Sequence, residues 1–253
     1  MNKLKHLLVI FIITSVMIIS GCASNGKKDR QQQRIASAKE LFEDATSAIN
    51  SGNYRTAVQK LEALDNRFPF GEYTQSAQLN LIYAYYKSGD PASALSTADR
   101  FIRQNPQHAR VDYAYYMKGL VNYTEENTAF TSLFSAEVAE RDSSTARQAF
   151  EDFAELIKRF PESEYVHDAQ KRMIFLRNRL ATYELYVAQY YMTRDAYHAA
   201  LRRAKYVVEH FPQTPATPKA LDIMITSYDI LGLQDLAEST RRVLKLNYPD
   251  YEL

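Results

Sequence analysis

The chain has 253 residues, of which 46% are hydrophobic and 24% charged, a balance typical of a globular protein. Its 31 basic and 30 acidic residues almost cancel, which argues against a general affinity for nucleic acid or anionic lipid. The single cysteine excludes an intramolecular disulfide framework.

The first 21 residues are typical of a signal peptide and not of a folded domain. Lys3 and Lys5 precede a 13-residue apolar run, Leu7–Ile19, which is short for a membrane span. The residues that follow, Ile19–Cys22, resemble the bacterial lipobox. This resemblance implies cleavage before Cys22 and covalent attachment of S-diacylglycerol and an N-acyl chain to that cysteine. Ala23, in place of the aspartate associated with inner-membrane retention, implies an outer-membrane anchor.

Cleavage before Cys22 would leave 29 basic and 30 acidic residues, a net charge of −1. Membrane attachment would then depend on the lipid. An ordinary secretory signal followed by an incidental cysteine is the alternative. Residues 23–34 are polar and contain no large apolar side chain, so we expect residues 22–34 to form a lipidated, flexible tether.

A regular spacing of alanine and proline predicts helical repeats. Prolines 69, 106, 161, 212 and 249 each stand 12 residues after an alanine. The tetratricopeptide repeat has a similar alanine and closing proline in a 34-residue period. Here the spacing is 37 residues from Pro69 to Pro106, from Pro212 to Pro249, and between the turn glycines Gly52 and Gly89. Each small alanine would let two helices approach closely, and neighbouring pairs would stack because one pair cannot bury its apolar side alone. The alanines are Ala57, Ala94, Ala149, Ala200 and Ala237.

We therefore predict one all-α domain over residues 35–253, an α-solenoid of about five tetratricopeptide-like helix pairs. The expected repeats cover residues 35–69, 70–106, 107–161, 162–212 and 213–249. The expected helices of the first two repeats are Ile35–Asn50, Tyr54–Phe68, Gln75–Lys87 and Pro91–Asn105.

The third and fourth repeats are longer than the others. The surplus of the third falls in Thr124–Ser144, which we expect to connect its two helices as a loop. In the fourth, Glu164–Met192 has a helical pattern throughout and predicts an extra helix or one long kinked helix. The fifth repeat, Pro218–Leu246, is regular, and its last helix should cap the stack.

Catalytic and metal-binding motifs are missing from the sequence. The four histidines beyond the signal peptide are scattered, without HExxH or comparable ligand spacing. No GxSxG occurs, and the glycines form no phosphate-binding loop. We expect a protein with no catalytic residue, no metal and no cofactor other than the lipid on Cys22.

Tyrosines give the main candidate binding site: the chain has 19, and no tryptophan. At positions that line the concave face in the tetratricopeptide family, two first helices carry stripes of large side chains. Tyrosine offers a rigid apolar ring and a hydroxyl, which suits a groove for an extended peptide with aromatic or apolar side chains. The candidate groove residues are Leu79, Tyr83, Tyr86, Tyr113, Tyr116, Leu120 and Tyr123.

The alternative for these side chains is ordinary packing between helices, which we expect for Tyr85 and Tyr115 on the opposite stripe. Lys87, at the end of the first stripe, could meet a C-terminal carboxylate. Basic residues on the second helices of the last two repeats, such as Arg202 and Arg203, are most simply explained as solvated residues on an outer face.

Five segments carry a resemblance to one family. They are LEALDNRFPFGEY, LIYAYYK, DRFIRQNP, DYAYYMKGL and FLRNRLATYELYVAQYY, and they resemble the ComL/YfiO family of outer-membrane lipoproteins. The resemblance implies a non-enzymatic, lipid-anchored subunit of the β-barrel assembly machine, on the periplasmic side of the outer membrane. It also implies five repeats.

In that family the N-terminal repeats face C-terminal signals of unfolded outer-membrane proteins. The C-terminal repeats dock on the POTRA domains of the barrel subunit and bind further small lipoproteins. Arg203 falls where the family carries an arginine used in this docking, although the fifth repeat matches the family least. A cell-wall-associated or pilus-associated repeat lipoprotein is the alternative function.

Overall fold

The computed structural model describes residues 25–132 and 142–252. The predicted signal peptide and Cys22, the predicted site of lipid attachment, lie outside these ranges. Every regular element within them is an α-helix, which confirms the all-α prediction. The expected single domain forms two compact units, an N-terminal unit, Met1–Ser88, and a C-terminal unit, Gly89–Leu253.

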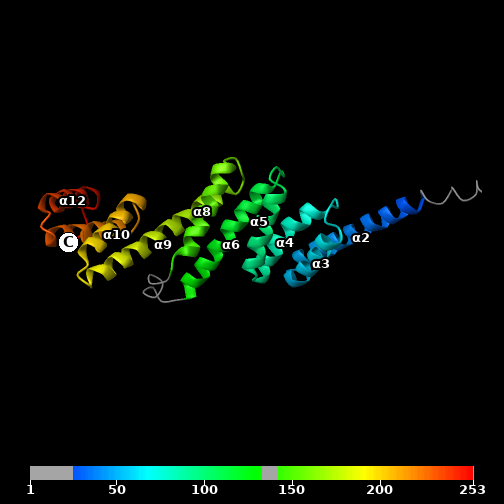
Figure 1. The fold of residues 1–253 in the computed structure, drawn as a ribbon, viewed down its shortest axis with the longest axis horizontal. Coiled ribbons are helices and arrows are strands. Elements are labelled where there is room, and N and C mark those ends of the chain that lie inside the picture. The colour runs from blue at the N-terminus through cyan, green and yellow to red at the C-terminus, as the bar shows by residue number, and fades with distance from the viewer. Residues whose placement is uncertain (1–24, 133–141, 253) are drawn as a thin grey trace, which may run out of the picture. The chain divides into compact units, whose positions relative to one another are not determined.

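The N-terminal unit contains three helices (Figure 1): α2 (Asn25–Asn50), α3 (Tyr54–Arg67) and α4 (Thr74–Ser88). Helix α3 packs against both α2 and α4. Asn53 caps the start of α3, where its side-chain oxygen accepts a 3.3 Å hydrogen bond from the Thr56 amide. The buried core of this unit consists of Ala45, Ala48, Ala57, Leu61, Leu64, Ala77, Leu81 and Ala84.

The expected tether is wrong in its extent. Helix α2 begins at Asn25, so most of residues 22–34 are helical and not extended. Lysine, arginine and glutamine are good helix formers. A polar segment joined directly to an amphipathic helix can therefore continue that helix without a hydrophobic face of its own.

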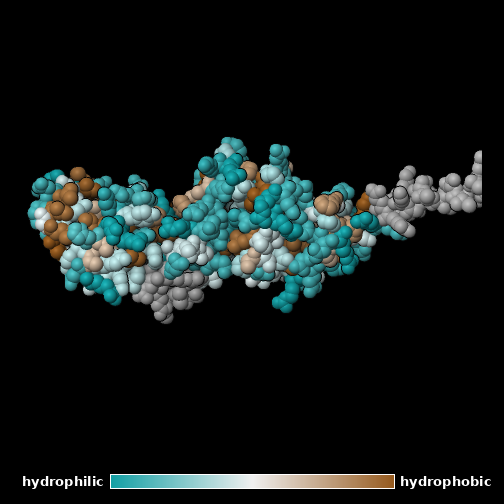
Figure 2. All heavy atoms as spheres, in the orientation of Figure 1, coloured by the Kyte–Doolittle hydropathy of each residue, from teal (hydrophilic) through white to brown (hydrophobic). Residues whose placement is uncertain are grey.

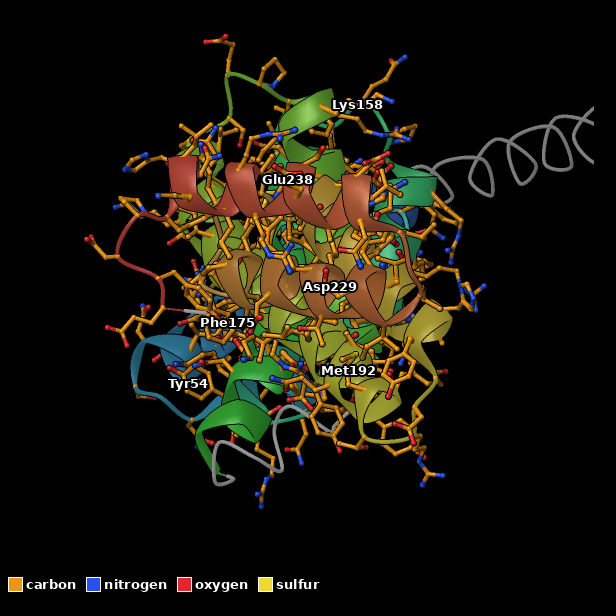
Figure 3. The ribbon with its side chains drawn as sticks, turned by 90° about the vertical axis from the view of Figure 1, so that its left-hand side faces the viewer. Tyr54, Lys158, Phe175, Met192, Asp229 and Glu238 are labelled. Atoms are coloured by element: carbon orange, nitrogen blue, oxygen red, sulfur yellow. The ribbon has the colours of Figure 1, made fainter. Side chains whose placement is uncertain are left out.

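The C-terminal unit holds seven described helices, each packed on the next along the chain (Figure 1). They are α5 (Pro91–Gln104), α6 (Val111–Ser132), α8 (Ser144–Arg159), α9 (Val166–Met192), α10 (Tyr197–His210), α11 (Thr217–Ile230) and α12 (Gln234–Asn247). Helix α9 also contacts α6 and α11. The Ser227 hydroxyl of α11 donates a 3.4 Å hydrogen bond to the Met192 sulfur at the end of α9, and Met192 is labelled in Figure 3.

The structural roles predicted for the repeat alanines and prolines are confirmed in both units. All five repeat alanines have no exposed surface, as expected where two helices approach closely. The residue before each repeat proline is a helix C-cap whose amide bonds back to the carbonyl four residues earlier, because proline disfavours helical geometry in the residue before it. These caps are Phe68, Asn105, Phe160, Phe211 and Tyr248.

The third repeat differs from the expectation, and the fourth takes one of its two expected forms, a single long helix. Helix α6 continues to Ser132, so the first part of Thr124–Ser144 is helical and not a loop. The segment of the fourth repeat forms one 27-residue helix, α9, with no extra helix. The added lengths of α6 and α9 are joined by a buried ion pair, in which Arg179 Nε donates a 2.7 Å hydrogen bond to Glu126 Oε1. This pair links the additional turns of α6 to α9.

The last helix does not provide a polar cap. Figure 2 shows apolar residues gathered at the C-terminal end of the chain. Large apolar side chains at the end of α11, in the turn that follows and on α12 remain exposed, and they include Ile230, Leu233, Leu236, Val243 and Leu246. A terminal repeat that only closed a solenoid would have a polar outer face.

Candidate functional site

In the N-terminal unit, tyrosines of α3 and α4 form a small partly exposed cluster. The rings of Tyr54 and Tyr83 meet edge to face, with centroids 6.0 Å apart. The Lys87 ammonium lies 5.6 Å from the centre of the Tyr54 ring, a cation–π contact. Burial, followed by the hydrogen bond with Tyr54, raises the pKa of Tyr83. Lys87 is thus held over an aromatic ring, and Tyr86 is partly buried on the same helix.

Leu79 is not a groove residue. It is only 2% exposed, because α4 buries residues around most of its circumference. A stripe of large side chains shows which residues share a helix face, but not how wide the buried face is. The sequence prediction is therefore wrong for Leu79.

In the C-terminal unit, α6 presents Tyr113, Tyr116 and Tyr123 to the beginning of α9. The Tyr116 ring stacks on Tyr165, with centroids 4.7 Å apart and an interplanar angle of 20°. Tyr113 meets Tyr165 at 5.7 Å, and Tyr123 meets Phe175 edge to face at 5.6 Å. Figure 3 labels Phe175. All three α6 tyrosines and Leu120 are partly exposed, unlike Tyr115, which is 7% exposed as expected for the opposite stripe.

Charged groups border these rings. The Tyr116 hydroxyl donates a 2.7 Å hydrogen bond to Asp168, and Arg172 Nε donates one of 2.6 Å to the same carboxylate oxygen. The Arg172 guanidinium lies 4.8 Å from the centre of the Tyr123 ring, and that of Arg110 lies 5.0 Å from the Tyr113 ring. Each arginine is thus placed for a cation–π contact.

These contacts shift two pKa values in the cluster. Burial, then the bond to Asp168, raises the pKa of Tyr116 to about 12, so this hydroxyl stays a donor at physiological pH. Burial by itself would raise the pKa of Asp168, but hydrogen bonds from Arg172 and Tyr116 outweigh it and lower that pKa. Asp168 is therefore a stable carboxylate.

We call this set the α6–α9 aromatic cluster; it comprises Tyr113, Tyr116, Tyr123, Tyr165, Asp168, Arg172 and Phe175. It offers partly exposed rings beside a fixed guanidinium, a surface suited to apolar or aromatic side chains on an anionic chain. The sequence prediction found only its α6 members. For the α9 side of the cluster, the sequence contained one signal, the i, i+4 spacing of Asp168 and Arg172. That spacing occurs on many solvated helices, so it did not indicate a binding site.

Arg203 lies on α10 and has a partner within the chain. Its Nη1 donates a 2.8 Å hydrogen bond to Glu184 Oε2 on α9. The Glu184 side chain is 5% exposed and that of Arg203 is 45% exposed. Arg147 of α8 approaches the other oxygen of Glu184, at 3.9 Å. Neither Arg147 nor Glu184 could be identified from the sequence, since their proximity to Arg203 depends on how three helices pack.

The described residues contain no group of three or more histidine, cysteine, aspartate or glutamate side chains placed to hold a metal ion. Nor does any described helix combine the length and the apolar character needed to cross a membrane.

Known proteins resemble this chain over most of its length. Residues 34–244 match the family YfiO, described as outer membrane lipoprotein. The chain is 43% identical to an outer membrane protein assembly factor BamD of Vibrio cholerae over 208 residues, covering 82% of this chain and 86% of that protein. It is 39% identical to the BamD of Neisseria meningitidis serogroup B, covering 95% and 91%. With the BamD of Xylella fastidiosa (strain Temecula1) it shares 36% identity, covering 97% and 83%. Because the family match spans most of the helical repeats and these relatives align over most of their length, the chain belongs to the YfiO family of outer membrane lipoproteins.

Proposed function

We propose that this chain is a non-enzymatic subunit of the outer-membrane β-barrel assembly machine. In this role it scaffolds the complex and binds C-terminal signals of unfolded outer-membrane proteins before their insertion. The relatives named above are all outer membrane protein assembly factors, which favours this function over a cell-wall or pilus scaffold.

The observation that carries the substrate-binding role is the α6–α9 aromatic cluster. Three partly exposed tyrosines lie in a row on one helix. The first of them, Tyr113, packs against Tyr165, and the last, Tyr123, packs against Phe175. Rigid rings that are already packed lose little entropy when a ligand binds. Arg172 and Arg110 add positive charge at the border, where a terminal carboxylate would be attracted.

The scaffolding role involves the C-terminal repeats. We propose that Arg203, which is partly exposed on α10, docks on an acidic residue of the POTRA domains of the barrel subunit. The exposed apolar residues of α12 would receive a further lipoprotein of the complex, because such a surface is unfavourable in water. Cys22 would carry the lipid that anchors the chain to the outer membrane, with the repeats facing the periplasm.

Peptide binding tests the substrate role. The full-length protein in detergent is titrated with a fluorescent peptide that copies the last residues of an outer-membrane barrel protein from the same bacterium. The double substitution Tyr113→Ala and Tyr123→Ala should weaken binding about tenfold or more, as expected when aromatic contacts of an interface are removed.

Tyr190→Ala is the matched control, because Tyr190 is an exposed tyrosine on the same long helix, α9, outside the cluster. It should bind the peptide like the wild type. The proposal fails if the double variant retains its helical circular dichroism and binds the peptide with unchanged affinity.

A further inference from the structure

We infer that Arg147 and Arg203 together form the receptor for one acidic side chain of a partner protein, and that the buried Glu184 is the residue that positions them. The inference rests on the docking role proposed for Arg203. It adds a second arginine from another repeat, and a positioning residue that does not touch the partner.

The geometry is that of one carboxylate bridging two guanidinium groups. Glu184 lies on α9, which packs against both α8 and α10. Its Oε2 accepts the 2.8 Å hydrogen bond from Arg203 of α10, and its Oε1 lies 3.9 Å from Nη2 of Arg147 of α8. Because a different oxygen faces each arginine, the carboxylate links three successive helices.

Burial separates the roles of the three residues. The Glu184 side chain is 5% exposed, whereas those of Arg147 and Arg203 are 44% and 45% exposed. A partner can therefore reach both arginines but not the glutamate. Glu184 is held by its helix and its burial, so it restricts where the two long arginine side chains can lie.

The buried Glu184 carboxylate carries one negative charge and faces two guanidinium groups. The Asp142 carboxylate also interacts electrostatically with Arg147, but Asp142 is exposed, so water and salt screen this attraction. A guanidinium has five N–H donors, and the bond to Glu184 occupies one donor of Arg203. The 3.9 Å approach of Arg147 is too long for a hydrogen bond. Donors of both arginines thus remain for a second carboxylate, which planar guanidinium groups bind well.

Two other exposed cations in this unit are arranged differently. Lys205 lies 3.5 Å from Glu209, and Arg242 lies 3.6 Å from Glu238; Figure 3 labels Glu238 on α12. In both pairs an exposed acid one turn away on the same helix matches the cation. Such pairs are flexible and screened by water. The arginines around Glu184 instead share a buried anchor, and ordering them before binding reduces the entropy lost in the complex.

The test is a double-mutant cycle on the affinity for the partner. The full-length protein in detergent is titrated with the purified POTRA domains of the barrel subunit from the same bacterium. Arg203→Gln should weaken binding about thirtyfold or more, as expected for one side of a desolvated charge pair. Arg147→Gln should weaken it by about fivefold, and its effect should depend on Arg203, because neighbouring residues of one network are coupled.

Glu184→Gln gives the sharpest result, because two explanations predict opposite signs. Removing an acid raises the net positive charge, so a purely long-range attraction would make binding tighter. If Glu184 positions the arginines, binding becomes about fivefold weaker, and this effect is lost when Arg203→Gln is also present. Glu209→Gln on α10 changes the net charge equally and should not weaken binding.

The outcomes distinguish this inference from the proposed function. Failure of the wild-type protein to bind the POTRA domains would overturn the proposed docking and this inference with it. Wild-type binding that Arg203→Gln weakens, but that Glu184→Gln and Arg147→Gln leave unchanged or strengthen, would overturn only the inference. If Glu184→Gln does not fold, by circular dichroism, the exposed Arg147→Gln variant and its coupling to Arg203→Gln decide the matter.

Discussion

The Tyr116 hydroxyl donates its hydrogen bond to an Asp168 carboxylate that lies 52 residues later in the sequence, at a distance of 2.7 Å. This bond joins α6 to the beginning of α9 and fixes the ring of Tyr116 against Tyr165. It therefore holds the centre of the α6–α9 aromatic cluster in place, and its removal should affect both stability and the surface proposed to bind peptides.

Tyr116→Phe should lower the free energy of unfolding by about 1 kcal/mol at pH 7. The pKa of Asp168 is lowered below its ordinary value of 3.8 in the folded state, so its stabilising contribution is present above that value. It is lost as the pH falls through the folded pKa. The difference between variant and wild type should therefore narrow in urea unfolding at pH 3. Tyr206→Phe on α10 is the control, and an equal loss at both pH values would exclude an ionised Asp168 as the partner.

Gly119→Ala should destabilise the C-terminal unit by about 1–3 kcal/mol, because a side chain there overfills a tight contact. A Cβ atom at this position would lie 2.5 Å from the Phe153 ring of α8. Thermal or urea unfolding measures the loss. Combining the substitution with Phe153→Leu should make the effect of Gly119→Ala smaller; equal effects in both backgrounds would show that the close approach of α6 and α8 is not the cause.

Arg179→Met should be strongly destabilising, by about 3–5 kcal/mol, since it leaves Glu126 charged and buried without its partner. The side chains of Arg179 and Glu126 are 1% and 2% exposed. Adding Glu126→Gln should recover part of the loss in chemical denaturation. Arg159→Met breaks an exposed pair with Glu155 and should cost less than about 1 kcal/mol. Similar losses for the two arginines would contradict the importance of burial.

Cys22→Ser should prevent lipid attachment and release the protein from the outer-membrane fraction, either as an uncleaved precursor or in the periplasm. Several acyl chains on one cysteine anchor a protein stably, whereas one chain alone binds reversibly. Membrane fractionation and metabolic labelling with palmitate measure the change. Undiminished labelling of the serine variant would exclude Cys22 as the site. Combining Cys22→Ser with Arg203→Gln separates lipid anchoring from retention by the partner.

Features set by short stretches of sequence were predictable. The predicted helix end before each repeat proline agrees with the structure. Proline ends a helix locally, because its ring clashes with the preceding turn and its nitrogen has no hydrogen to donate. The repeat alanines could be identified as buried because their spacing recurs. The tyrosine row of α6 followed from helix periodicity alone.

Predictions failed where the local sequence allows two outcomes. The polar residues from Asn25 onward are compatible with either a flexible tether or a helix. Because an amphipathic helix follows them directly, the helix is favoured. The surplus of the third repeat also allows both a loop and a helix. Helix α6 continues through its first part, where Glu126 forms an ion pair with Arg179. Such a buried pair has no periodic signature.

The sequence by itself thus determined the family, the helical repeats and the α6 side of the candidate peptide site. Only the tertiary structure decided that Leu79 is buried, that Tyr116 bonds to Asp168, and that Glu184 bridges Arg147 and Arg203. The physical reason is distance along the chain: helix periodicity and capping act over a few residues. The pairing of a buried charge depends on which helix faces become neighbours, and the packing of the whole unit sets that arrangement.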